Sequence, residues 1–298
     1  MSKDHQNDEI VAVRLKHPWR WVSAAILMLL GGLFVYSLVS SPNINHEIIA
    51  KFLFNSKVID AAVLTVILTI VSMFIGTVLA IALAVMRLST NPILKSVSVL
   101  YVGFFRGTPL LLQIVFWGYL GIIYPTITVG IPFTDIVFFS EKTSLVLTSI
   151  IAGVIALSLN EGAYAAEIVR AGILSVDGGQ TEAGKSLGMS SGYTLRRIVL
   201  PQAMRVIIPP MGNEFISMLK STSLLQVVSV MELYARTSQI SSQNLAQVEL
   251  LVVAGFWYLV MTTVLSWPQS YLEKKYGRGF YATTTQRRWL GRIGKASA

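Results

Sequence analysis

The chain has 298 residues, of which 53% are apolar and only 13% are charged, whereas soluble domains carry about 25% charged residues. This composition excludes an ordinary soluble globular protein and indicates an integral membrane protein. The chain has no cysteine, which excludes disulfides, and the spacing of its three histidines argues against a metal site. Its net charge of +9 requires no nucleic-acid partner if the basic residues mark the cytoplasmic side of a membrane.

Six apolar stretches are long enough to cross a bilayer, whose hydrocarbon core of about 30 Å needs about 20 helical residues. They are residues 21–39, 61–86, 102–124, 144–168, 206–231 and 250–272. The first stretch follows a short basic arm, but it is longer than the apolar region of about 7 to 15 residues in a signal peptide. We therefore interpret it as a retained helix and predict an all-α membrane protein with six transmembrane helices.

The distribution of basic residues predicts that both termini are cytoplasmic. With that orientation, nineteen of the 24 Lys and Arg residues lie inside and five lie outside, and such a bias sets membrane topology. The chain then divides into 1–60 (cytoplasmic arm, first helix and outer linker), 61–272 (transmembrane core) and 273–298 (basic cytoplasmic tail).

The third apolar stretch contains a glycine and a proline close to its start. Arg106-Gly107-Thr108-Pro109 precedes Leu110. Gly107 and Pro109 are consistent with a helix that begins at the membrane interface, where Arg106 would reach lipid phosphates.

Glu161, in the fourth stretch, is expected near the middle of the bilayer. If Arg170 marks the cytoplasmic boundary, Glu161 lies about 13 Å deeper, at about 1.5 Å per helical residue. A charge at that depth costs at least about 2.5 kcal/mol, so we expect Glu161 to face a cavity or a partner. Tyr164 is also consistent with core packing, and Glu167 with an interfacial ion pair to Arg170.

A polar segment from Glu182 to Pro201 separates the fourth and fifth stretches and predicts two short helices. Gly188 lies where the first would end, Ser190 or Ser191 can cap the second, and Pro201 is expected to end it. Neither helix is long enough to be stable alone. Packing or a partner must hold both, so the segment is predicted to be a docking surface.

Gly179 to Ser186 matches the literal P-loop pattern of Gly, four residues and Gly-Lys-Ser. A true P-loop follows a buried strand and opens a helix whose backbone amides hold phosphate. The residues before Gly179 continue a membrane helix instead. We therefore expect no nucleotide binding by this segment.

The fifth stretch combines helix breakers with charges. Pro209-Pro210-Met211-Gly212 precedes Glu214, and Lys220 follows six residues later. Broken backbone at membrane depth is tolerated where it lines a cavity, and a carboxylate with an ammonium group would suit a zwitterionic solute. Structural pairing of Glu214 with Lys220 or Arg205 is the alternative.

Several of these patterns resemble known families. The spacing of the polar segment is similar to the EAA loop of ATP-binding-cassette importer permeases, with Gly184 where that family usually has Ala; the matching residues are Glu182, Ala183, Gly184, Gly188, Ile198, Leu200 and Pro201. Residues 106–113 (RGTPLLLQ), 163–173 and 220–224 resemble permeases for polar amino acids of the histidine and glutamine type. The resemblance covers roughly residues 61–279.

The resemblance implies a type I importer permease, with a five-helix family core plus the extra N-terminal helix. It implies uptake of a polar or charged amino acid across the cytoplasmic membrane and no catalytic site in this chain. ATP and Mg would bind to two partner ATPase subunits that contact the EAA loop, with an extracytoplasmic binding protein and a second permease copy or sister permease as further partners. The candidate pathway residues are Glu161, Glu214, Lys220, Thr108 and Tyr164, although the family more often has a small residue at the position of Glu161.

Other functions stay open. The same architecture could carry another small solute, and a sensor subunit docked on an ATPase would keep the loop without solute flux. A membrane enzyme has little support, because the sequence contains no HExxH, no GxSxG and no paired catalytic carboxylates at intramembrane spacing.

The basic bias generates a prediction about topology. The chain has no cysteine of its own, so single cysteines report their position cleanly. We expect cysteines at Ser190 and Ser297 to react with an impermeant maleimide only from the cytoplasm, and one at Ser241 only from outside. Labelling of Ser190 from outside intact cells would contradict the whole topology.

Overall fold

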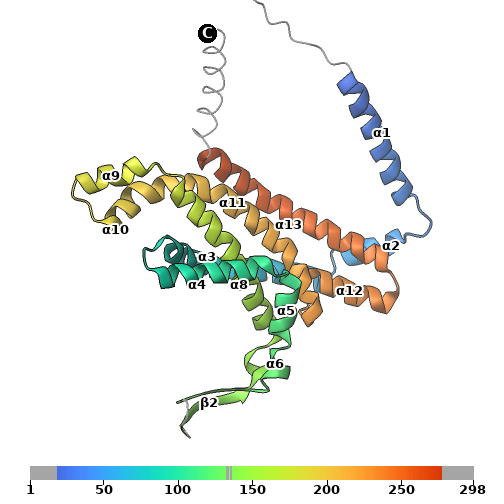
Figure 1. Ribbon diagram of the computed structural model, residues 1–298. Coiled ribbons are helices and arrows are strands. Elements are labelled where there is room, and N and C mark those ends of the chain that lie inside the picture. Colours follow the sequence, from blue (N-terminus) through green and yellow to red (C-terminus); the bar gives the residue numbers. More distant parts are fainter. Residues whose placement is uncertain (1–18, 132–133, 135, 277–298) are drawn as a thin grey trace, which may run out of the picture. The chain divides into compact units, whose positions relative to one another are not determined.

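The computed structural model describes residues 19–131, 134 and 136–276, and these residues are mostly helical (Figure 1). The all-α class is thereby confirmed. The basic arm before Trp19 and the tail after Tyr276, including Ser297, lie outside the described residues. The chain divides into two compact units, residues 1–47 and 48–298.

The first unit contains the helix α1 (Trp19–Val39), whose 21 residues are mainly apolar and exposed. It is long and apolar enough to cross a membrane, in agreement with the predicted first span. A short helix, α2 (His46–Leu53), leads along the chain into the second unit.

The second unit is built on two long helices, α3 (Ser56–Leu88) and α8 (Ser149–Leu174), which pack along each other. Asn55 caps α3 and Thr148 caps α8 by accepting a backbone N–H in each first turn. Around this pair lie α4 (Pro92–Gly107), α5 (Leu110–Gly118), α11 (Leu200–Ser221) and α13 (Gln247–Tyr276).

Small residues bring α3 and α8 together. A Cβ added to Gly76 of α3 would lie 2.8 Å from Cβ and Cγ of Glu161, and one added to Gly162 of α8 would lie 2.8 Å from Leu79. Ala80 and Ala163 are fully buried in the same interface. Such close approach suits a membrane, where helices associate through packing and not through exclusion of water.

The predicted third span is wrong in its shape. The structure has two helices instead of one, because α4 begins already at Pro92, ends at Gly107, and is bent by 99° from α5. Pro109 causes the break, since it lacks an N–H and disfavours helical backbone at Thr108, which is extended. A four-residue helix, α6 (Leu120–Ile123), follows α5.

The fifth span also differs from its prediction. Helix α11 continues through Pro209 and Pro210, where a broken backbone was expected, and ends at Ser221 in the 3₁₀ helix η2 (Thr222–Val228). Pro201 does not end the preceding helix either. The π-turn η1 (Leu195–Val199) runs directly into α11 with Pro201 in its first turn. A π-turn is wider than an α-turn, which makes room for the proline ring.

The residues expected outside the membrane form more structure than predicted. A two-stranded antiparallel hairpin, β1 (Thr126–Gly130) with β2 (Val137–Lys142), precedes the short helix α7 (Thr143–Val146). The expected polar outer stretch is the helix α12 (Leu233–Asn244), capped by the buried carboxylate of Glu232, which also accepts a 2.8 Å hydrogen bond from Tyr258 of α13.

Within the described ranges, four helices are long and apolar enough to span a membrane, or five if α4 and α5 form one bent span. Helix α11 does not meet that criterion, so the count of six spans stays a prediction. For the labelling experiment, Ser241 proves to be a poor position because it is buried. Ser242, its exposed neighbour on α12, is the better one.

Candidate functional site

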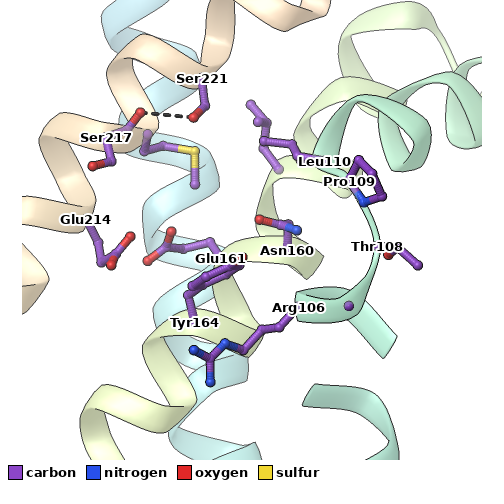
Figure 2. Close-up of a pocket in the computed structure, with 13 residues that line it drawn as sticks. Arg106, Thr108, Pro109, Leu110, Asn160, Glu161, Tyr164, Glu214, Ser217 and Ser221 are labelled. Carbon is purple, nitrogen blue, oxygen red and sulfur yellow. Dashed lines mark hydrogen bonds between the residues drawn. The ribbon is translucent and has the colours of Figure 1, made fainter. Parts of the chain in front are cut away.

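A cavity of about 490 Å³ lies where the break between α4 and α5 meets α8 and α11 (Figure 2). This volume is within the range of small-molecule sites, about 300 to 1,000 Å³. The lining comes from three parts of the chain: residues 106–110 at the break, then Leu157, Asn160, Glu161 and Tyr164 of α8, and Glu214, Ser217, Met218 and Ser221 of α11.

Two carboxylates give this cavity its acidic character. Glu161 on α8 and Glu214 on α11 point toward each other across it (Figure 2). Glu161 is only 5% exposed, and its Oε1 atom has no hydrogen-bond partner among the described residues. A buried carboxylate is stable only when a cation or hydrogen-bond donors compensate it, so the unpartnered oxygen keeps Glu161 a candidate contact for a cationic solute.

The backbone of α3 makes room for Glu161. Gly76 faces the Cβ and Cγ atoms of Glu161, and a Cβ at position 76 would come 2.8 Å from both. Since those atoms are the stem of the side chain and lie next to the backbone of α8, they cannot move away easily. Any larger residue at position 76 would displace Glu161 or separate the two helices.

Arg106 supplies the positive charge of the cavity. Its guanidinium carbon lies 5.1 Å from the centroid of the Tyr164 ring, a cation–π contact. Arg106 itself is exposed, and the described part of the chain offers it no hydrogen bond and no ion pair within 4.0 Å. The two carboxylates are therefore not neutralised by a direct salt bridge to Arg106.

Two amides stabilise the break that forms one wall. Gln113 Nε2 donates to the carbonyls of Phe105 and Thr108 at 3.0 and 3.1 Å and to Thr108 Oγ1 at 2.8 Å. Asn160 Nδ2 on α8 donates to Phe105 O and to Gln113 Oε1, both at 3.1 Å. The last carbonyls of α4 have no partners within the helix, so these amides satisfy them and tie the break to α8.

The structure brings together four of the five candidate pathway residues, since Thr108, Tyr164, Glu161 and Glu214 all line the cavity. Lys220 is exposed and does not line it. Six helical positions separate Lys220 from Glu214, and at about 100° per residue they place the two side chains about 120° apart around the helix axis. No ion pair joins Glu214 to Lys220 or Arg205 within the described ranges.

Sequence reasoning missed Asn160, Ser217 and Ser221. A signal was present: Glu214, Ser217 and Ser221 follow the spacing i, i+3, i+7, which places them on one face of a helix. Asn160 lies on the face of α8 that carries Tyr164, four residues away. Following the helical period from Glu214 would have found Ser217 and Ser221, whereas Asn160 directly precedes Glu161 and only the tertiary structure shows that it lines the cavity.

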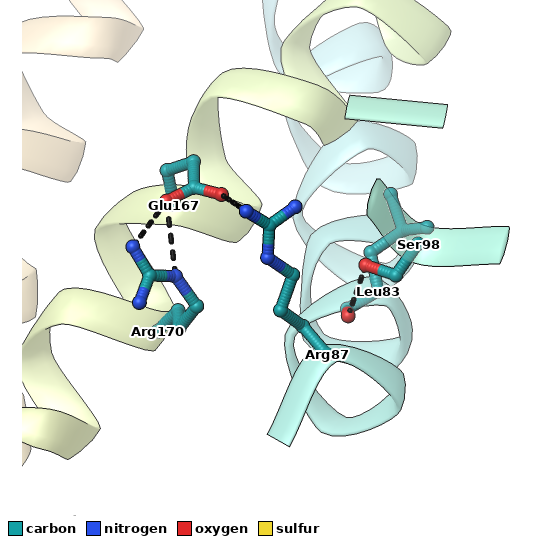
Figure 3. Close-up of polar contacts among 5 residues, drawn as sticks. All are labelled: Leu83, Arg87, Ser98, Glu167 and Arg170. Carbon is teal, nitrogen blue, oxygen red and sulfur yellow. Dashed lines mark hydrogen bonds and ion pairs between the residues drawn. The ribbon is translucent and has the colours of Figure 1, made fainter. Parts of the chain in front are cut away.

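An ion cluster lies one to two turns beyond Tyr164 on α8 (Figure 3). Glu167 Oε2 accepts hydrogen bonds from Arg170 at 2.7 and 3.0 Å, and its Oε1 lies 3.5 Å from Arg87 Nη2 of α3. The expected Glu167–Arg170 pair is therefore present and is extended by a residue from another helix. The cluster connects the end of α3 to α8 shortly before α8 ends.

The predicted docking segment is a compact helical hairpin, which projects beyond the ends of α8 and α11 (Figure 1). Helix α9 (Gly178–Ser186) is capped by Asp177. Helix α10 (Ser191–Thr194) is capped by Ser190, one of the two serines expected in that role. The P-loop-like residues 179–186 lie inside α9 and follow a helix, not a strand. This geometry lacks the phosphate-binding loop that the pattern requires.

The motif residues of this hairpin divide into an inner and an outer set. Gly184 is buried against Thr194, whose Cγ2 and Oγ1 would lie 2.8 and 2.9 Å from an added Cβ, and Ile198 lies next to them. Glycine at position 184, instead of the alanine usual in the resembled loop, therefore fits the neighbouring Thr194. Glu182 and Ala183 point outward and are exposed. Leu200 and Pro201 begin α11.

Gly188 makes the turn between the two short helices. It has a φ of +75°, and the bonds Met189 N–H to Gly184 O and Gly188 N–H to Lys185 O form a Schellman motif at the end of α9. Close packing does not require glycine here, because no atom lies within 4 Å of an added Cβ. Its backbone conformation is the physical reason for glycine.

No group of three or more His, Cys, Asp or Glu side chains among the described residues is placed to hold a metal ion. Two features of the described structure bear on function. One is the acidic cavity between α8 and α11, and the other is the exposed hairpin that joins the same two helices.

Comparisons with known proteins agree with this geometry. Residues 76–278 match the family described as binding-protein-dependent transport system inner membrane component. The arginine transport system permease protein ArgU of Corynebacterium glutamicum is 46% identical over 283 residues, which cover 95% of this chain and 88% of that protein. The L-cystine transport system permease protein TcyB of Bacillus subtilis is 41% identical over 216 residues, 72% of this chain and 84% of that protein.

A solved structure described as an amino acid ABC transporter with histidines contains a chain that is 33% identical to this one. The match covers 74% of this chain and 94% of that chain, with a TM-score of 0.61.

The Gly188 turn generates a prediction about the docking hairpin. Gly188→Ala should destabilise it by about 1 kcal/mol, because alanine in the left-handed conformation is strained. Faster hydrogen exchange and proteolysis within residues 178–199 would show this. Gly192→Ala is the matched control, since Gly192 is helical and an added Cβ there meets nothing within 4 Å. Equal protection in both variants would rule out a conformational role for Gly188.

Proposed function

Since the chain belongs to the family of binding-protein-dependent transport system inner membrane components, we propose that it is the permease subunit of an ATP-driven importer of amino acids, with cationic amino acids as its preferred solutes. The chain is a transporter subunit and not itself an enzyme. The acidic cavity between α8 and α11 is the observation that carries the choice of solute.

The charges of the cavity favour a cationic solute. Two carboxylates, Glu161 and Glu214, face one guanidinium, and that guanidinium lies on the Tyr164 ring and not on either carboxylate. Buried carboxylates attract ammonium or guanidinium groups strongly because the surrounding dielectric constant is low. The hydroxyls of Ser217 and Ser221 add polar contacts on the same wall. The arginine permease relative is consistent with this choice.

The chain path suggests how ATP hydrolysis is coupled to the cavity. Helices α8 and α11 both line the cavity, and the docking hairpin joins their adjacent ends. Its second half continues through η1 into α11 without a break. A displacement of the hairpin by a partner is therefore transmitted to two cavity walls at once.

The remaining partners follow from this proposal. Two ATPase subunits would bind ATP and Mg and contact the exposed side of the hairpin, and an extracytoplasmic binding protein would deliver the solute. A second copy or a sister permease would complete the pathway in the cytoplasmic membrane, with both termini inside. A change between inward-facing and outward-facing states from 1:99 to 99:1 needs about 5.5 kcal/mol of differential binding, which ATP and the loaded binding protein would supply together.

Reconstitution tests the function directly. The chain, its ATPase and its binding protein are placed in proteoliposomes, and amino acids are screened for uptake and for stimulated ATP hydrolysis. We expect stimulation by cationic amino acids above neutral ones. ATP hydrolysis without accumulation of any solute would favour a sensor subunit and refute the proposed import.

The same system tests the hairpin. Glu182→Gln removes an exposed charge from α9 without touching the packing around Gly184. We expect weaker assembly or coupled hydrolysis and normal membrane insertion. Lys95→Gln, at an exposed position of α4, is the control for a general change of surface charge. Transport that is unchanged by Glu182→Gln would exclude this carboxylate from the coupling contact.

Glu161→Gln tests the cavity. It keeps the shape of the side chain and removes its charge, so transport should suffer far more than folding. Because hydrogen bonds to charged groups contribute about 1.5 to 3 kcal/mol, we expect a loss of about 10- to 100-fold in apparent affinity for cationic amino acids and a smaller loss for neutral ones.

Glu141→Gln, on the exposed strand β2 outside the cavity, is the matched control. A Glu161→Gln protein that transports normally, or that melts much earlier without a selective defect, would make Glu161 a structural residue.

A further inference from the structure

The cavity contains one charge that opposes the proposed solutes, the guanidinium of Arg106. We propose that Arg106 is a tethered competitor, which occupies the Tyr164 ring and lowers the affinity of the cavity for cationic solutes so that they can leave it. This inference rests on the proposed import of cationic amino acids.

Arg106 is weakly held where it lies. Its one direct contact of attraction is the Tyr164 ring at 5.1 Å, and the Glu214 carboxylate attracts it electrostatically from a longer distance. Within the described ranges it forms no hydrogen bond and no ion pair within 4.0 Å. It is also exposed and stands in the last turn of α4, next to Gly107, around which no atom lies within 4 Å of an added Cβ. Only a cation–π contact and a longer-range attraction therefore hold its side chain, which leaves it free to move aside.

Tyr164 and Glu161 form one recognition surface. They are three residues apart on α8 and both line the cavity, and Figure 2 shows the ring between Glu161 and Arg106. A solute cation that is attracted by Glu161 reaches the same ring that Arg106 occupies. Two cations at this ring repel each other, so one must leave or both bind more weakly.

A competitor of this kind would help the cavity to release its solute during transport. A pathway site must bind its solute well enough to accept it and weakly enough to release it. Glu161 and Glu214 together would hold a cationic amino acid strongly, and the binding protein already provides capture from outside. A built-in cation that returns to Tyr164 limits the residence time of the solute.

The test is equilibrium binding of radiolabelled L-arginine to the permease–ATPase complex in nanodiscs, without the binding protein. Arg106→Gln and Arg106→Met both remove the charge, and Arg106→Met keeps the unbranched apolar stem. Because an exposed cation–π contact is weak, we expect about two- to fivefold tighter binding of L-arginine in both variants. L-Citrulline has an uncharged group in place of the guanidinium, and its binding should not improve.

Two controls separate the possible causes of tighter L-arginine binding in the Arg106 variants. Lys95→Gln removes a positive charge of α4 outside the cavity and should leave L-arginine binding unchanged. In a Tyr164→Leu background, the gain from Arg106→Gln should shrink, because the competitor has already lost its ring. Should one Arg106 variant fail to assemble, the other still decides the question.

The outcomes distinguish this inference from the proposed function. A wild-type complex that binds neither L-arginine nor L-lysine refutes the proposed solute class, and the inference with it. If the wild-type complex binds L-arginine and neither Arg106 variant binds it more tightly, only the tethered competitor is refuted. Weaker binding of both L-arginine and L-citrulline would assign Arg106 to the solute carboxylate instead.

Discussion

The close packing of α3 on α8 is the constraint on which the rest of this structure depends. Glycine and alanine line the contact, and the Gly76 position has no room for a side chain beside Glu161. In a membrane, apolar side chains gain little from leaving lipid, so helices need such close approach to associate. The contact fixes the rotation of α8, and that rotation decides which of its residues face the cavity.

Because α8 is fixed in this way, it places three different groups along one helix. Glu161 and Tyr164 line the cavity, Glu167 joins the end of α3 through Arg87, and the docking hairpin begins shortly after Leu174. Helix α11 begins at the other end of the hairpin and reaches the cavity from the opposite wall. One continuous stretch of chain, from α8 through the hairpin to α11, therefore connects the cavity and the hairpin, whose movements an importer must coordinate.

The buried and half-buried acidic side chains of the second unit differ in how they are compensated. The Glu232 carboxylate accepts hydrogen bonds from Ala235 N–H, Tyr234 N–H and Tyr258. Glu167 is held by two guanidinium groups. Glu161, by contrast, has an oxygen without a partner among the described residues. Compensated carboxylates stabilise the fold, whereas an uncompensated one is costly and is therefore the best candidate for contact with the solute.

Local sequence patterns were enough to predict the membrane class, the helical hairpin around Gly188 and the position of Glu161 at a cavity. These features depend on local chemistry: apolar runs, capping residues and a charge at membrane depth. Only the three-dimensional arrangement shows that the break at Pro109 meets α8 and α11 at a cavity, and that Asn160 lines this cavity. Each of these depends on how helices distant in sequence are rotated against one another, and hydropathy carries no information about that rotation.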